Sequence, residues 1–177
     1  MAYPFEALPL QPDRLASADF QVYAVVEQAY GTRERTTWDR TSHTFVRTGL
    51  VMEQPMPVPY GWIPQTRNPN DGDALDVLIV TDKHLHMPQG TYLLVRPVGV
   101  LLRRDQDHKI LAVDLEDARF GLIHDYTELS SSLLAQIEDW FRRFFMLDGW
   151  GDAAAARLMI EQAHSACADH HAADSTP

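Results

Sequence analysis

Short apolar runs, separated by proline and glycine, fill the chain from Asp19 to about Asp114. They are rich in aromatic and β-branched residues, which is typical of β-strands. We expect strands over residues 20–26, 43–47, 75–81, 92–95, 98–102 and 110–113. Prolines at positions 55, 57, 59, 64 and 69 exclude a helix through the middle of this region. This spacing of short strands predicts a small barrel.

The pattern changes to a helical period after Asp125. Serines 130–132 can cap a helix, because their hydroxyls accept hydrogen bonds from unpaired backbone N–H groups. Apolar residues repeat at helical intervals over residues 133–145, and Gly149 follows at the expected position of a C-cap. A second, alanine-rich helix is expected over residues 152–168. The sequence therefore predicts one mostly β domain with two late helices.

The charge of the chain limits the partners that it can have. Twenty-five acidic residues against fifteen Lys and Arg give 177 residues a formal charge of -10. Nucleic acids and anionic membranes both require a basic face, so neither is expected as a main partner. No apolar run approaches the roughly 20 residues that span a bilayer, and the N-terminus has no signal-peptide pattern. A single cysteine, Cys167, suits a reducing cytoplasm.

Acidic residues gather in two places beside predicted strands. Residues 71–76 read DGDALD, which places Asp71, Asp73 and Asp76 within six residues. Carboxylates at this density suit Mg²⁺ or Mn²⁺, although a solvated acidic turn has the same composition. Asp105 and Asp107, with Lys109, follow a later strand and could equally form a charged hairpin tip. If the two groups lie at the same end of adjacent strands, five carboxylates could line one cavity.

Longer segments around these acids resemble the soluble family I inorganic pyrophosphatases. Residues 60–66 read YGWIPQT, and residues 71–78 read DGDALDVL. The acidic signature of that family is D-[SGDN]-D-[PE]-[LIVMF]-D, from which only Ala74 departs. RPVGVL at 96–101 and KILAV at 109–113 are also similar to the family. The similarity runs from about Phe20 to Asp148, so the chain is identified as a divergent member.

The resemblance implies an α+β fold, mainly β, in which a small closed, OB-like barrel is flanked by two C-terminal helices. One pyrophosphatase-like domain would cover residues 1–177, with residues 1–18 as an N-terminal arm and residues 169–177 as a frayed tail. It also implies an inorganic diphosphatase that hydrolyses pyrophosphate to two phosphates by a metal-activated water. Several Mg²⁺ ions would serve each site, with Mn²⁺ as a possible substitute. A cytoplasmic homo-oligomer is expected.

The resemblance further implies a role for each site residue. The metal ligands would be Glu27, Asp71, Asp76, Asp105 and Asp107. Asp73 would help to activate the attacking water. The phosphate groups would be held by Arg35, Arg47, Tyr60 and Lys109, of which Arg47, Tyr60 and Lys109 would also act in catalysis. Metal ions would reverse the sign of an acidic site that otherwise repels pyrophosphate.

Several positions depart from the family pattern. The family carries a phosphate-binding Tyr-Lys pair on its late helix, where this chain has Phe144 and Phe145. The other departures replace polar family residues and are Met56 for a tyrosine, Thr37 for a glutamate and Gln106 for an acid. Loss of a charged contact to a reacting phosphate can cost a hundredfold or more in rate.

These departures leave three functions open. The first is a working, slower pyrophosphatase. The second is a hydrolase of an organic diphosphate, admitted by an apolar wall of Met56, Phe144 and Phe145. The third is a metal-binding or phosphate-binding protein without catalysis. The complete set of acidic residues favours catalysis, because buried carboxylates are costly to keep without a function.

Overall fold

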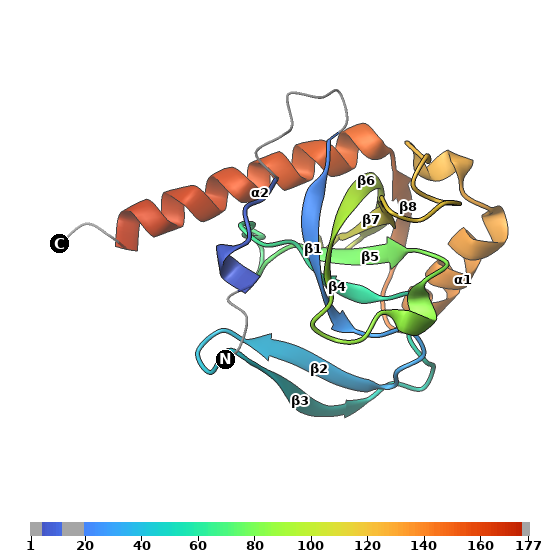
Figure 1. Ribbon diagram of the computed structural model, residues 1–177, viewed down its shortest axis with the longest axis horizontal. Coiled ribbons are helices and arrows are strands. Elements are labelled where there is room, and N and C mark those ends of the chain that lie inside the picture. Colours follow the sequence, from blue (N-terminus) through green and yellow to red (C-terminus); the bar gives the residue numbers. More distant parts are fainter. Residues whose placement is uncertain (1–4, 12–19, 175–177) are drawn as a thin grey trace.

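Five strands close into a barrel in the computed structural model, which describes residues 5–11 and 20–174 (Figure 1). The hydrogen-bonded order is β1 (Val22–Gln28), β4 (Tyr60–Trp62), β5 (Asp76–Val80), β7 (Lys109–Asp114) and β6 (Tyr92–Arg103). β6 also pairs with β1, which closes the ring, and β8 (Leu147–Gly151) extends the sheet beyond β6. The predicted class, a mainly β fold with a closed barrel and two C-terminal helices, is confirmed.

β5 and β7 form a parallel pair, whereas the other pairings of the barrel are antiparallel. Val77 of β5 lies opposite Ile110 of β7. The residues that precede them, Asp76 and Lys109, therefore lie at the same end of the barrel. This parallel register therefore brings the two acidic segments of the sequence close together in space.

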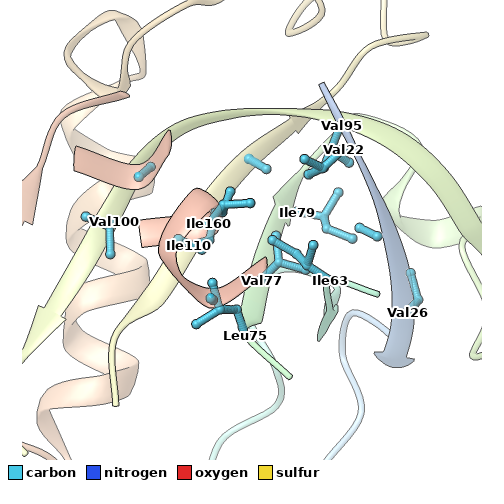
Figure 2. Packing of buried hydrophobic residues seen from close by; sticks show 14 of the residues in the cluster. Val22, Val26, Ile63, Leu75, Val77, Ile79, Val95, Val100, Ile110 and Ile160 are labelled. Carbon is cyan, nitrogen blue, oxygen red and sulfur yellow. The ribbon is translucent and has the colours of Figure 1, made fainter. Parts of the chain in front are cut away.

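The unbroken apolar runs of β5 and β7 are buried on both faces, as expected for strands without polar alternation. Val77 and Ile79 belong to one core cluster, to which α2 (Ala153–Asp174) contributes Ile160 (Figure 2). The alternate residues, such as Leu78, belong to a second cluster with Phe141 of α1 (Ser131–Arg142). The two helices thus cover different faces of the barrel wall (Figure 1).

Both predicted helices form, but their ends differ from the expectation. The Ser130 hydroxyl accepts a hydrogen bond from the Leu133 N–H at 3.3 Å and caps α1. The prediction of Gly149 as a C-cap is wrong, because α1 ends at Arg142 and Gly149 pairs with Leu102 in the sheet. α2 continues through residue 174, so residues 169–174 of the expected tail are helical, and residues 175–177 lie outside the described residues.

Three strands were not anticipated by the sequence: β4, β8 and β2 (Glu34–Asp39), which forms a separate hairpin with β3 (Thr44–Val51). Two expected strands are one, since β6 continues through Pro97. The register shifts between Pro97 and Gly99, where proline cannot donate a ladder hydrogen bond. Of the expected N-terminal arm, residues 1–4 and 12–18 lie outside the described residues. No helix in the described part has both the length and the apolarity to cross a membrane.

Candidate active site

Two adjoining cavities share Arg35 and Tyr60 in their walls. The first, here the acidic cavity, has a volume of about 120 Å³ and includes the carboxylates of Glu27, Asp73 and Asp76. The second, here the mixed cavity, has a volume of about 270 Å³. Besides the shared pair, it is lined by Gln28, Met52, Met56, Arg103, Asp107, Lys109, Trp140, Phe141 and Phe145. The expected carboxylates are therefore divided between two cavities, and Asp71 and Asp105 line neither.

Glu27 stands near the end of β1 and faces the acidic cavity. Its Oε1 accepts a hydrogen bond from the Trp38 backbone N–H at 2.6 Å. Burial, together with the negative charge of Asp76, raises the pKa of Glu27 despite that hydrogen bond. Thr37 lines the same cavity and its hydroxyl contacts Glu27, so the aligned threonine remains part of the site.

Lys109 joins the two cavities through the parallel register of β5 and β7. Its buried ammonium group donates to Asp76 and also to Asp107, the latter at 2.7 Å. Burial raises the pKa of Asp76, while the ion pair with Lys109 opposes that shift. Tyr60 is also buried, and burial with the nearby Asp76 carboxylate raises the pKa of Tyr60 well above its usual value. Its hydroxyl is therefore neutral and donates to the Asp76 carboxylate.

The DGD segment forms a tight turn before β5. Gly72 has φ +81°, a conformation that glycine adopts without steric cost. The Asp71 carboxylate accepts a hydrogen bond from the Asp73 backbone N–H at 2.9 Å, so Asp71 stabilises the turn in this structure. Asp73 is exposed and lines the acidic cavity, where its carboxylate can contact a ligand.

Arg103 is a site residue that the sequence analysis missed. Its guanidinium is buried and donates to Asp105 and Asp107, with Nη1 at 2.8 Å from Asp107 Oδ2. The Arg103 Cζ also lies 3.4 Å from the centre of the Phe145 ring, a cation–π contact. A signal was present, because Arg103 is two residues from the buried Leu101 on the same strand and so shares its face.

Gln28 is the second missed residue. It closes β1, is 4% exposed and lines the mixed cavity. A glutamine after a run of apolar strand residues is the only sequence signal for it. Gln28 lies opposite Tyr60 of β4, beyond the part of β1 that pairs with β6.

Arg47 lies away from both cavities. It is exposed on β3 of the hairpin and pairs with Glu34 at 3.4 Å. Arg35, on the paired strand β2, lines both cavities instead. A phosphate contact by Arg47 therefore stays a prediction that requires its side chain to leave Glu34.

The departures from the family pattern separate into two groups in space. Met56 and Phe145 line the mixed cavity, so they do form an apolar wall beside Tyr60. Phe144 does not line it: this side chain is 40% exposed and packs edge-on against Trp140 at 5.5 Å. Gln106 is exposed, and its carbonyl oxygen accepts a hydrogen bond from Asn70 at 3.2 Å.

The donor set of the two cavities matches the chemistry of a hard divalent cation. Carboxylate oxygens are the ligands that Mg²⁺ and Mn²⁺ prefer, and in the acidic cavity three carboxylates are lined up against two arginines, Arg35 and Arg40. Within residues 5–11 and 20–174, no three His, Cys, Asp or Glu side chains already converge as a ligand set. Lys109 and Arg103 instead neutralise Asp76, Asp105 and Asp107 as ion pairs.

Comparison with known proteins gives one consistent result. The model of a family described as "Inorganic pyrophosphatase" matches residues 24–168. An inorganic pyrophosphatase of Halobacterium salinarum is 32% identical, over 92% of this chain and 95% of that protein. A crystal structure of inorganic pyrophosphatase from Ehrlichia chaffeensis has a TM-score of 0.74 at 29% identity, covering 85% of this chain and 99% of the other. One from Thermus thermophilus has a TM-score of 0.82 at 23% identity, over 93% and 99%, and shows the common fold.

Proposed function

The chain belongs to the inorganic pyrophosphatase family and is an enzyme of that class, and on this premise we propose that it hydrolyses inorganic pyrophosphate to two phosphates with Mg²⁺ as cofactor. Membership of the family implies a divalent metal. The observation that carries the proposal is the pair of cavities: three carboxylates line one beside Arg35 and Arg40, Arg103 and Lys109 line the other beside Asp107, and Arg35 and Tyr60 belong to both walls. A diphosphate has two linked anionic groups and fits such a division.

The metal would be held by carboxylates from both acidic segments, with Glu27 and Asp76 at the acidic cavity and Asp71, Asp105 and Asp107 around it. Burial raises the pKa of Glu27 and of Asp76, so each carboxylate is costly to keep charged without a cation. When bound, a divalent ion lowers the pKa of water and neutralises phosphate oxygens. Lys109 and Arg103 already lie among these carboxylates and limit their mutual repulsion.

Asp73 would accept the proton of the attacking water. The water oxygen bonds to one phosphorus, the bridging P–O bond breaks, and the second phosphate leaves with the bond electrons. Asp73 suits this role because its carboxylate is exposed to the acidic cavity and has no ion pair among the described residues. A positioned base of this kind contributes about 10²–10⁴-fold to a rate.

Arg35, Tyr60 and Lys109 would hold the phosphate oxygens, and Arg47 would join them from the hairpin. Tyr60 and Arg35 line both cavities, and the neutral Tyr60 hydroxyl, which donates to Asp76 in this structure, would turn to a phosphate oxygen when substrate binds. Donors fixed in place before the reaction stabilise the charge that spreads over the transferring group. A cytoplasmic homo-oligomer remains part of this proposal, and light scattering after gel filtration tests its assembly.

The test is release of inorganic phosphate from pyrophosphate across a panel of divalent cations. Wild type with Mg²⁺ should be active, and Asp73→Asn should lose about 10²-fold or more. Asp148→Asn is the matched control, since its exposed carboxylate binds Arg104 and lines neither cavity. Wild-type rates equal to buffer with every metal would refute the proposal.

A second candidate is hydrolysis of an organic diphosphate. It is favoured by the apolar part of the mixed cavity, where Met52, Met56 and Phe145 offer no polar group to a phosphate. The same assay with isoprenyl and nucleoside diphosphates separates the two candidates. A higher kcat/KM for an organic diphosphate than for pyrophosphate would select the second.

A further inference from the structure

Gln28 carries a buried polar group without a protein partner. Its side chain is 4% exposed, and its Nε2 has no hydrogen bond to any residue in the described part of the chain. Buried N–H groups are almost always hydrogen-bonded, because an unpaired donor loses its water without compensation. Since Gln28 lines the mixed cavity, this donor is available to a ligand there.

Arg103 lines the same cavity and is fixed from two sides. Its guanidinium lies over the Phe145 ring, while Nε and one N–H of each terminal nitrogen engage Asp105 and Asp107. A guanidinium has five N–H donors in a planar fork, so these bonds leave further N–H groups for an anion. Lys109 and Arg35 add positive charge to the same walls.

Gln28 and Arg103 line a different cavity from Asp73, the residue proposed to activate the water. Asp73 lines the acidic cavity, whereas Gln28 and Arg103 line only the mixed one. Arg35 and Tyr60 belong to both walls and mark the boundary between them. A diphosphate that crosses this boundary has one phosphate near Asp73 and the other near Gln28 and Arg103.

We propose that Gln28 and Arg103 form a subsite that binds the phosphate group remote from the attacking water, and so determine how tightly a diphosphate is held. The inference rests on the proposed function and names two residues that no signature of the sequence includes. The Gln28 amide and the Arg103 guanidinium both donate to phosphate oxygens. Phe145 takes part indirectly, because its ring holds the guanidinium plane at the cavity wall.

The deciding variant is Gln28→Leu, which removes the amide and keeps a side chain of similar size. Its KM for pyrophosphate should rise about tenfold while kcat changes by less than about threefold, because one hydrogen bond to a charged group is lost. The affinity for inorganic phosphate, measured by calorimetry in Mg²⁺ buffer, should fall by about the same factor. The melting temperature should stay level or rise, since a buried unpaired donor disappears.

Arg103→Lys is the second variant, because it keeps the positive charge and loses the planar fork. It should also weaken phosphate binding, since lysine offers no paired donors and stacks poorly on Phe145. Arg104→Lys is the matched control: the neighbouring arginine is exposed, binds Asp148 and lines neither cavity. Its KM and phosphate affinity should equal those of wild type.

An unchanged KM and phosphate affinity in Gln28→Leu would overturn the subsite. A fall in melting temperature with unchanged phosphate affinity would do the same, because Gln28 would then be structural only. Calorimetry separates this inference from the proposed function. If wild type fails to hydrolyse pyrophosphate but Gln28→Leu weakens phosphate binding, the hydrolase proposal fails and the subsite stands.

Discussion

Lys109→Met removes the cation that lies between Asp76 and Asp107 while keeping an apolar side chain of similar length. The Lys109 side chain is 3% exposed, and its ammonium group donates to both carboxylates. In the variant these two carboxylates lose the cation that lies between them. Burial already raises the pKa of Asp76, so its charged form becomes still more costly.

The size of the loss in stability follows from how deeply Lys109 and its two carboxylate partners are buried. Removal of one partner from a buried ion pair costs about 3–5 kcal/mol. Asp76 and Asp107 keep 24% and 31% of their side-chain exposure, so water screens part of the repulsion and the lower end of that range applies. A loss of about 3 kcal/mol in a chain of this length corresponds to a fall of about 6–12 °C in melting temperature.

Thermal unfolding by circular dichroism, in chelator and then in Mg²⁺, measures this loss. Arg104→Met is the matched control, because the Arg104 guanidinium pairs with Asp148 at 2.9 Å and the two side chains are 60% and 44% exposed. Such a pair contributes at most about 1 kcal/mol. The deficit of Lys109→Met should narrow in Mg²⁺, which supplies another counter-ion to the carboxylates. Equal melting temperatures for the two variants in chelator would refute the reasoning.

Three further outcomes are expected. Millimolar Mg²⁺ should raise the melting temperature of wild type, because binding to the folded state at 100 times Kd adds about 2.7 kcal/mol; no shift in differential scanning fluorimetry would contradict a metal site. Asp117→Asn should lower the urea midpoint of unfolding at pH 7 and should lower it much less at pH 3. Burial raises the pKa of the Asp117 carboxyl, but hydrogen bonds from the backbone N–H groups of Phe120, Asp82 and Arg119 outweigh burial, so this pKa is lowered. Stability from a lowered pKa is present above the unfolded value of 3.8 and is lost as pH falls through the folded one. Gly61→Ala should fail to fold, since its Cβ would lie 1.8 Å from the Val25 carbonyl oxygen; soluble yield and circular dichroism check this.

The last two outcomes have internal controls. For Asp117→Asn, a midpoint deficit that stays constant between pH 7 and pH 3 would show that the carboxylate charge does not stabilise the loop. For Gly61→Ala, the control is Gly31→Ala, where no atom lies within 4 Å of the added Cβ. Gly31 has φ +76°, so that variant should lose only about 1–2 kcal/mol and remain folded.

The local pattern of the sequence located four strands of the barrel, β1, β5, β6 and β7, and the first turn of each helix. An unbroken apolar run such as residues 77–80 must be buried on both faces, because either face would otherwise expose apolar surface to water. The pattern could not locate β4, a strand of three residues, or the end of α1. These depend on pairing with distant segments, such as Gly149 with Leu102, which no local period encodes.

Of the acids that the sequence marked for the candidate site, Glu27, Asp73, Asp76 and Asp107 line its cavities, whereas Asp71 and Asp105 line neither. Only the tertiary structure decided which cations neutralise these carboxylates and which cavity each carboxylate lines. The parallel register of β5 and β7 brings Lys109 to Asp76, thirty-three positions away. Inward orientation on β6 brings Arg103 onto Phe145, and pairing of the end of β1 with β4 places the buried Gln28 opposite Tyr60. The reason is physical: side-chain direction within a strand is local, but the identity of its neighbour depends on the whole fold.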